Sequence, residues 1–181
     1  MTVLTAWNLS ILITWRCRMR PIEFRVWDKL RNRYVNGDRY GDLALDLQNG
    51  NVLYGDLGCE DGICVVTEQV IIEQCTGLRD KNGIKIFEGD IVRIDNLEIF
   101  ELTSNYNDKL AKGSCISDVK IIDGHTYVWL APVIDGKTIK YGAQYLKQGL
   151  AKHIKKSAVA TDNVEIIGTI HENKELLEVA E

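Results

Sequence analysis

The sequence predicts a mainly β fold with a minor helical part, and three observations support this. Short runs of residues alternate between apolar and polar, which is the period of two that a half-buried strand requires, and Ile22–Trp27 is the first such run. Gly, Asp and Asn separate the runs at short intervals, as turns do in a β meander. Only two stretches of the chain carry a helical pattern instead.

The strand-like runs follow one another along most of the chain. After the first strand, Asp28–Asn32 predicts a turn into a short strand at Tyr34 and Val35. The further runs are Leu43–Leu47, Asn51–Tyr54, Ile63–Thr67, Val70–Cys75, Asp90–Ile94, Leu97–Leu102, Val119–Ile122, Thr126–Ala131 and Val164–Ile170. We therefore expect many short strands.

Two segments favour helices. Gly142–Ser157 predicts an amphipathic helix before the last strand, because its apolar residues recur with helical spacing. Those residues are Leu146, Leu150 and Ile154, at positions i, i+4 and i+8. Lys174–Val179 predicts a short C-terminal helix, which Asn173 can cap.

The segment Thr76–Val92 is dense in glycine and charged residues, so it could bind a ligand or only turn the chain. Its Asn-Gly pair is the strongest short-range signal for a β-hairpin, because both residues tolerate the positive φ of a primed turn. A phosphate-binding loop fits poorly, since Gly77 and Gly83 are one residue too far apart and no Lys-Ser or Lys-Thr follows. We predict two structural turns, formed by Asp80, Asn82, Gly83, Gly89 and Asp90.

Length, composition and charge predict one compact globular domain. The chain has 181 residues, of which 45% are hydrophobic and 27% charged, as in ordinary globular proteins. Its formal net charge of -4 gives no overall attraction to nucleic acid, so such a contact requires a local basic patch. Five cysteines are an odd number without the density of a disulfide framework, which favours a reducing compartment such as the cytoplasm.

The first eighteen residues differ from the rest of the chain. Thr2–Trp15 is mostly apolar, and arginines follow it rather than precede it. A secretory signal has the opposite order, and a membrane span needs about 20 apolar residues. Three interpretations remain: a weak membrane anchor, an additional packed element, or an extension upstream of a true start at Met19. The last is favoured because Met19 leads directly into a strand, which places the domain at 19–181.

Three blocks of residues occur in an order that resembles one known family. They are IEFRVWD at Ile22–Asp28, TGLxDKNGxxIxEGDIV at Thr76–Val92, and VEIIGxIxENxELL at Val164–Leu177. Together they resemble the YopX family of phage and prophage proteins. The resemblance runs from Met19 to the end of the chain, with only a loose match over Leu97–Ala160.

The resemblance implies a fold and a source, and no reaction. It implies mainly β structure, with a small barrel of SH3-like character around the Gly-Asp-Ile-Val strand, and a phage or prophage protein acting in a bacterial host. The chain departs from the family pattern at His171, where Tyr is usual, and at Lys174, where Pro often begins the last turn. These two departures concern local packing.

The residues themselves form no recognisable catalytic or metal-binding motif. The close pair Cys59 and Cys64 has no second pair to complete four ligands, and no serine lies in a Gly-x-Ser-x-Gly elbow. The three histidines form no His-x-x-x-His pair. They are His125, His153 and His171. We therefore predict a protein that is not an enzyme, with no catalytic residue, cofactor or metal.

A binding protein is the remaining class. We expect an accessory or regulatory factor that binds another protein or itself, since small β-barrels leave strand edges and loops free for contacts. A structural protein that assembles with itself is one alternative, and a nucleic-acid-binding regulator is the other. Aromatic side chains could stack on bases, although at strand spacing they more often belong to the core. They are Trp27, Tyr34, Tyr40, Tyr54, Tyr106 and Trp129.

One segment of the chain concentrates basic charge. It is Ala151–Lys156, within the predicted amphipathic helix. Its lysines would share one helical face, and they are Lys152, Lys155 and Lys156. This face is either the solvated side of the helix, which is the more ordinary interpretation, or a candidate contact for nucleic-acid phosphates.

Overall fold

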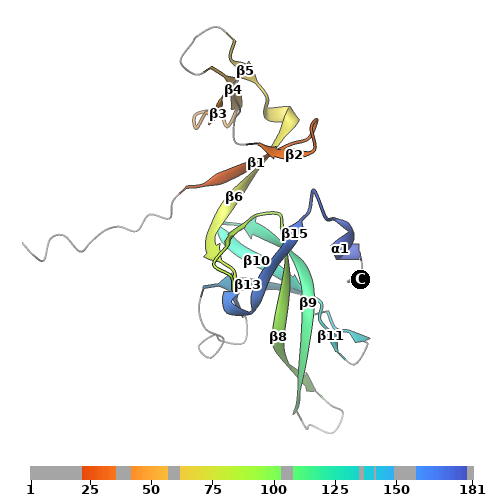
Figure 1. The fold of residues 1–181 in the computed structure, drawn as a ribbon. Coiled ribbons are helices and arrows are strands. Elements are labelled where there is room, and N and C mark those ends of the chain that lie inside the picture. Colours follow the sequence, from red (N-terminus) through yellow and green to blue (C-terminus); the bar gives the residue numbers. More distant parts are fainter. Residues whose placement is uncertain are drawn as a thin grey trace, which may run out of the picture.

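The protein is described by a computed structural model over residues 22–35, 42–56, 62–102, 108–134, 137–140, 142–148 and 158–178. The predicted mainly β fold is confirmed, because strands dominate these residues. The structure is elongated, with a small sheet at one end, a second sheet beside it and a large curled sheet at the other end (Figure 1). The predicted extension, residues 1–18, lies outside the described residues.

The second sheet has four antiparallel strands in the order β2-β1-β6-β7. They are β1 (Phe24–Asp28), β2 (Arg33–Val35), β6 (Val70–Arg79) and β7 (Lys85–Phe87). The turn between β1 and β2 is closed by Asp28, whose Oδ1 accepts hydrogen bonds from the backbone N–H groups of Leu30 at 2.9 Å and Arg31 at 3.0 Å. The predicted strand, turn and strand are therefore found at the predicted place.

The small sheet at the end of the molecule has three antiparallel strands in the order β3-β4-β5. They are β3 (Asp42–Leu45), β4 (Val52–Gly55) and β5 (Cys64–Val65). A single 3-10 turn at Thr67–Gln69 leads from this sheet into β6. The two sheets are thus joined directly along the chain.

The large sheet curls into a half-barrel, in agreement with the expected small barrel-like fold. Its strands are β8 (Asp90–Leu102), β9 (Asp108–Ile122), β10 (His125–Leu130), β11 (Val133–Ile134), β12 (Lys137–Thr138), β13 (Gly142–Lys147), β14 (Ala158–Ala160) and β15 (Val164–Thr169). The main path is β12-β11-β9-β10-β13-β14, and β8 lies between β9 and β15. The β13–β14 pair is parallel.

The hydrophobic core fills the concave side of this half-barrel. The alternation of side chains along β10 places every second residue in this core. Thr126, Val128 and Leu130 are buried, while the residues between them point outward. The buried residues of the core are Ile86, Val92, Ile94, Cys115, Val119, Val128, Leu130, Leu146, Val159 and Val164. The strand after the Glu88-Gly89 turn therefore lies at the centre of the fold.

The amphipathic helix predicted for Gly142–Ser157 is wrong where the structure describes it. Gly142–Lys147 is β13, which pairs with β10 and β14, and Leu146 is buried between the exposed Tyr145 and Lys147. Six residues with one buried leucine satisfy a period of two as well as a helical period, and sheet pairing decides between them. The other two apolar positions of the predicted helix, Leu150 and Ile154, lie outside the described residues.

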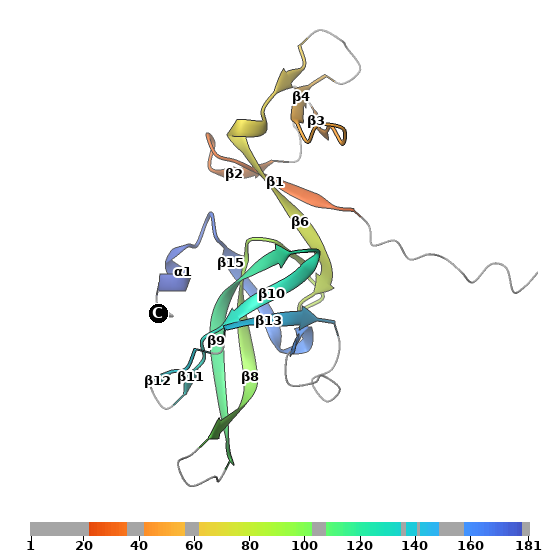
Figure 2. The same cartoon turned by 180° about the vertical axis from the view of Figure 1, so that it is seen from behind.

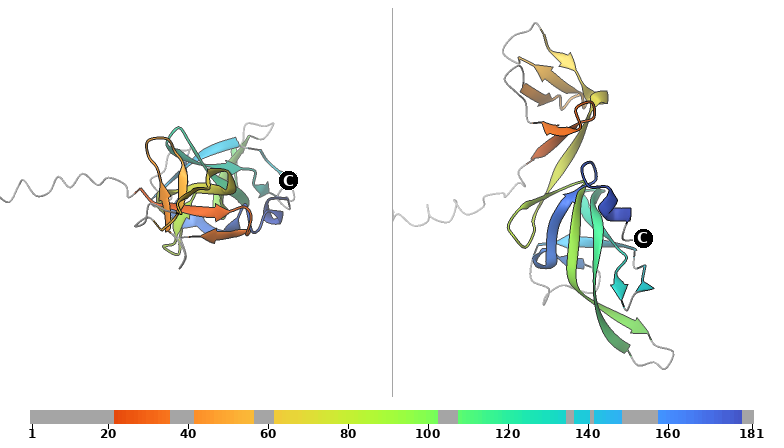
Figure 3. Two further views of the ribbon diagram at one scale, coloured as in Figure 1. Left: turned by 90° about the horizontal axis from the view of Figure 1, so that it is seen from above. Right: turned by 45° about the vertical axis from the view of Figure 1, so that its right-hand side comes forward.

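Two further predictions are corrected in extent. Asp90–Ile94 and Leu97–Leu102 belong to one strand, β8, with an irregularity between Ile94 and Leu97 where Asn96 has a φ of +55°. The strand β9 begins at Asp108, eleven residues before the predicted Val119. Apart from this irregularity, the two strands pair from Ile91 and Asp118 to Leu102 and Asp108, and they form a long arm (Figure 3).

The last element that the structure describes is the predicted short helix, α1 (Glu175–Glu178). The proposed capping residue has another role, because the side-chain oxygen of Asn173 accepts a hydrogen bond from the backbone N–H of Thr169 at 3.4 Å. In the described part of the chain, no helix has the length and apolar character needed to cross a bilayer.

Candidate functional site

The first predicted turn lies between β6 and β7. The backbone N–H of Gly83 donates to the carbonyl of Asp80 at 3.0 Å, and the N–H of Asp80 donates to the carbonyl of Ile84 at 2.9 Å. Gly83 has a φ of +81°, whereas Asn82 is not among the described residues with positive φ. The turn therefore has a left-handed glycine at its end and is not the primed two-residue turn that was predicted.

Asp80 holds this turn in place. Its Oδ1 accepts from the backbone N–H groups of Asn82 and Ile84, both at 2.9 Å, and its Oδ2 accepts from the N–H of Ile166 at 3.3 Å. The carboxylate is buried, and its oxygens accept hydrogen bonds from the backbone of the turn itself and of β15. Asp80 is therefore placed to shape the turn and to hold it against β15.

The second predicted turn brings Gly89 against a buried acid. Gly89 has a φ of +78°, and a Cβ atom there would lie 2.1 Å from Oε1 of Glu73. The next residue, Asp90, is only 1% exposed and accepts a hydrogen bond from the N–H of Phe87 at 2.8 Å. The turn therefore lies beside a group of buried charged side chains.

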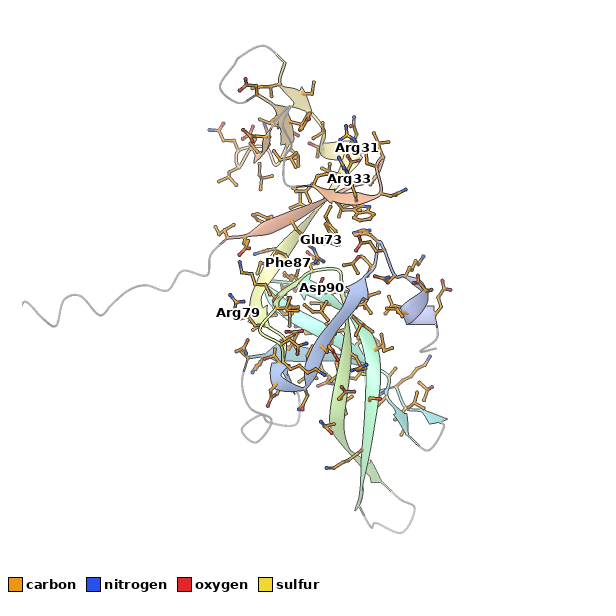
Figure 4. The ribbon with its side chains drawn as sticks, in the orientation of Figure 1. Arg31, Arg33, Glu73, Arg79, Phe87 and Asp90 are labelled. Carbon is orange, nitrogen blue, oxygen red and sulfur yellow. The ribbon has the colours of Figure 1, made fainter. Side chains whose placement is uncertain are left out.

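These charges form an ionic cluster, which we define as Arg25, Tyr34, Glu73, Asp90 and His171. Glu73, which is 2% exposed, lies at its centre. Its Oε2 accepts from Arg25 Nε at 2.6 Å and from the Tyr34 hydroxyl at 3.1 Å, while its Oε1 lies 3.0 Å from His171 Nε2. Figure 4 shows Glu73 and Asp90 near each other beside Phe87.

Arg25 connects the two acids of the ionic cluster. Its Nη1 forms an ion pair with Asp90 Oδ1 at 2.7 Å, and its Nη2 donates to the carbonyl of Glu88 at 3.2 Å. Its guanidinium carbon lies 4.7 Å from the ring centre of Tyr34 and 4.9 Å from that of Phe87. The arginine is therefore held on its edges by acids and on its faces by aromatic rings.

Burial and charge together set the protonation of the ionic cluster. Burial lowers the pKa of Arg25, but the charges of Asp90 and Glu73 outweigh it, so the net shift is upward. Burial raises the pKa of Tyr34 to about 12. Burial also raises the pKa of Asp90, and the hydrogen bond from Phe87 and the charge of Arg25 offset this only in part.

His171 closes the ionic cluster from the C-terminal side. Its ring stacks on Trp27 with 4.8 Å between ring centres and an interplanar angle of 12°. It occupies the position where the family resemblance suggested Tyr, and a hydrogen bond to Glu73 is available to either residue type. The ionic cluster joins β1, β2, β6, β8 and the segment after β15, and its acids are closed from solvent.

The other described residues that could bind a metal or act as nucleophiles form no cluster. Among the residues that the structure describes, no group of three or more His, Cys, Asp or Glu side chains could hold a metal ion. Cys64 is exposed, while Cys75 and Cys115 are buried. Several candidates from the sequence lie outside the described residues, namely Tyr40, Cys59, Tyr106, Lys152, His153, Lys155 and Lys156.

An aromatic face lies on the outer, convex side of the half-barrel, and we define it as His125, Tyr127 and Trp129 of β10 with Tyr145 of β13. Tyr127 is directly opposite Tyr145, so these side chains share one side of the sheet. The ring centres of Tyr127 and Tyr145 are 4.7 Å apart, and those of His125 and Tyr145 are 5.6 Å apart. Trp129 is 59% exposed and Tyr145 is 37% exposed. Figure 2 shows the strands β9, β10 and β13 side by side.

The charges around the aromatic face are nearly balanced. Lys120, opposite Tyr127 on β9, is paired with Asp118 at 3.2 Å. Lys147 lies with its Nζ 5.9 Å from the ring centre of Tyr145. A hydrogen bond with Tyr145 raises the pKa of Tyr127, so its hydroxyl stays neutral. The face therefore offers rings and hydroxyl groups rather than net charge.

The sequence contained a signal for this face. Alternation in the run Thr126–Ala131 places Tyr127 and Trp129 on the same side of a strand. For the aromatic residues the sequence left open a contact role and the more frequent core position, and the structure buries Trp27 but leaves Trp129 exposed. The missing information was which side of the strand faces the core.

Comparisons with known proteins place the chain in a family. A solved structure, the crystal structure of protein EF1440 from Enterococcus faecalis, is similar, with 22% sequence identity over 86% of this chain and 97% of that chain and a TM-score of 0.41. A search of the curated proteins found no match. The family model described as YopX protein matches residues 23–178, which is most of the chain. The chain therefore belongs to the YopX family.

Proposed function

We propose that this chain is a non-enzymatic binding protein, an accessory or regulatory factor encoded by a phage or prophage and acting in the cytoplasm of a bacterial host. Its docking surface is the aromatic face. The observation that carries the proposal is the exposure of Trp129, at 59%, beside other rings on two paired strands. Trp and Tyr are enriched at the centres of protein interfaces, where few residues supply most of the binding energy.

The rigidity of the aromatic face supports this proposal. His125, Tyr127 and Trp129 project from one strand that is paired on both sides, by β9 and β13. Their backbone is already ordered, and each ring has only two rotatable side-chain bonds. Docking a partner therefore costs less conformational entropy here than on a loop.

The occupant of the aromatic face, in this proposal, is a second copy of the chain. A nucleic acid would require several unpaired cations for its phosphates, whereas Lys120 is already paired with Asp118 and only Lys147 is left of the two lysines described beside this face. Two copies of a chain with a net charge of -4 repel each other, and they approach at lowest cost where the surface is neutral. A two-fold contact also needs only one self-complementary patch.

The ionic cluster supports the non-enzymatic part of the proposal. Among the described residues, the ionic cluster combines side chains of the types that act in acid–base catalysis. It contains an acid beside a histidine and a second acid beside an arginine. Both acids, Glu73 and Asp90, are almost completely buried. Because they are buried, a substrate could contact these two acids only if the structure around them opened.

Sedimentation velocity over a range of concentrations tests the proposal. We expect a reversible dimer for the parent chain, and a dissociation constant at least about 30-fold higher for Trp129→Ala and Tyr145→Ala, as for interface hot spots. Leu47→Ala, which removes an exposed apolar side chain from a turn of the small sheet, is the matched control and should leave the dimer unchanged.

Other outcomes identify other occupants. A parent chain that stays monomeric at its highest soluble concentration would overturn the second copy as the occupant. Quenching of tryptophan fluorescence by a single-stranded oligonucleotide, lost in Trp129→Ala, would assign the face to nucleic acid instead, since bases stack on exposed rings. Thermal melts of each variant confirm that the fold is retained.

A further inference from the structure

A cavity of about 330 Å³ lies where the β1–β2 hairpin, the small sheet and the start of β6 meet. Its volume is at the lower end of the range for small-molecule sites. The strands that contribute its lining residues lie at the other end of the molecule from the long arm of β8 and β9 (Figure 3). The cavity shares no residue with the ionic cluster or with the aromatic face.

The walls of this cavity are mainly apolar. Val35, Leu43, Val66 and Val70 line it together with Val65, which is 60% exposed. An exposed valine in a concave site is costly to hydrate, and an apolar molecule seated against it would remove that surface from water. The walls thus favour a ligand with an apolar body.

Two arginines at the cavity differ in their partners. Arg31 is neutralised, because its Nη1 lies 3.0 Å from Asp28 Oδ2, and the other oxygen of that carboxylate accepts from the turn backbone. Arg33 is exposed on β2 and has no acid partner among the described residues. Both side chains lie on the β2 side of the molecule (Figure 4). One uncompensated guanidinium therefore stands at an apolar cavity.

We infer that this cavity binds a small organic carboxylate. The carboxylate pairs with the guanidinium of Arg33, which presents parallel N–H donors in the geometry that a carboxylate accepts. The apolar body lies along Val35, Leu43 and Val65. This site stands independently of the proposed docking function of the aromatic face.

The alkylation rate of Cys64 can report binding, because its exposed thiol lines the same cavity. The rate of its alkylation by iodoacetamide is followed in the intact chain by peptide mass spectrometry, with hexanoate as the probe. Hexanamide, which has the same body without the charge, is the matched ligand control. We expect saturable slowing by hexanoate, and at least about a tenfold higher concentration of hexanamide for the same slowing.

Variants of Arg33 decide whether the charge acts through this side chain. Arg33→Gln should remove the preference for hexanoate over hexanamide, and Arg33→Lys should reduce it, since lysine keeps the charge and loses the paired donors. Lys140→Gln makes the same change in net charge at another exposed position and should leave the preference intact. The lysine variant provides the test if the glutamine variant does not fold.

Three results would overturn the inference. The first is no slowing of Cys64 alkylation by hexanoate at any soluble concentration. The second is equal slowing by hexanoate and hexanamide, which would mean that only apolar contact matters. The third is a preference for hexanoate that survives in folded Arg33 variants. Free N-acetylcysteine, alkylated in the same solutions, corrects for any effect of the probes on the reagent.

Discussion

Replacing Gly89 with alanine tests how much the ionic cluster contributes to the stability of the fold. The new Cβ would lie 2.1 Å from Oε1 and 2.9 Å from Cδ of Glu73, so the Glu73 side chain has to move. Glu73 would then leave Arg25, Tyr34 and His171 together, because all three contact the same carboxylate. One methyl group thus perturbs every contact of the central acid.

The size of the effect follows from two costs. A φ of +78° is left-handed, and an alanine there costs about 1–2 kcal/mol. Disrupting a buried ion pair costs about 3–5 kcal/mol when a charge loses its partner. The sum of about 4–7 kcal/mol is comparable with the stability of a small domain, about 5–15 kcal/mol. We therefore expect a severe loss of stability, from near-complete unfolding to a large shift in the urea midpoint.

Two other glycines provide matched controls. Gly83 and Gly124 have φ values of +81° and +73°, and a Cβ atom at either position would meet no atom within 4 Å. Alanine at these positions should cost only the conformational part, about 1–2 kcal/mol. The comparison therefore separates the contact with Glu73 from the backbone conformation.

Urea unfolding at pH 7, followed by tryptophan fluorescence, is the assay. A loss of stability in Gly89→Ala no larger than in Gly124→Ala would refute the reasoning, since the contact with Glu73 would then cost nothing. A double variant refines the test. In a Glu73→Ala background the additional cost of Gly89→Ala should fall to that of the controls, because no carboxylate remains for the methyl group to displace.

Three further predictions rest on the structure, and a fourth rests on the sequence. Gly83→Val should cost about 1–3 kcal/mol in urea unfolding, because a β-branched residue resists positive φ, and unchanged stability with loss of a ligand would make this turn a binding site. The pKa of Tyr34, raised to about 12 against about 10 in the unfolded chain, predicts that stability falls between about pH 10 and 12, and that Tyr34→Phe flattens this slope in urea titrations. Burial raises the pKa of Cys115 to about 11, so mass spectrometry should find Cys64 alkylated first and Cys115 only on unfolding. If the basic segment contacts nucleic acid, changing three lysines to Gln should flatten a log-affinity versus log-salt slope of up to about -3, and no binding by the parent at low salt would exclude this contact. The three are Lys152, Lys155 and Lys156.

The sequence predicted the fold well where local pattern determines structure. The alternation of Ile22–Trp27 and Thr126–Ala131 identified real strands, and the Asn-Gly pair marked a real turn. The pattern failed at Gly142–Lys147, because a short run with one buried leucine satisfies two periods. Pairing with β10 and β14 decided the structure, and no local signal encodes those partners.

The candidate site was less predictable, for a related reason. Arg25 and Glu73 are 48 residues apart, and Glu73 and His171 are 98 residues apart, so the ionic cluster has no motif. Gly89 was predicted only as a turn residue, although the approach of Glu73 gives a second reason for glycine there. Alternation in the sequence groups Tyr127 with Trp129 on one side of a strand, so the aromatic face could in principle be predicted. The sequence does not indicate which side of that strand faces the core.

The place of β15 in the large sheet has a consequence for how the protein is made. Val164 of β15 pairs with Ile94 of β8, so a ribosome adds Ile94 about 70 residues before its partner residue exists. At about 5–20 residues per second, this gap lasts roughly 4–14 seconds. During that time one edge of β8, including Val92 and Ile94, has no strand beside it, and such an edge can pair with another nascent chain. Aggregation during synthesis should therefore depend on how quickly the last strand follows, and a pause in translation before Val164 should lower the yield of folded protein.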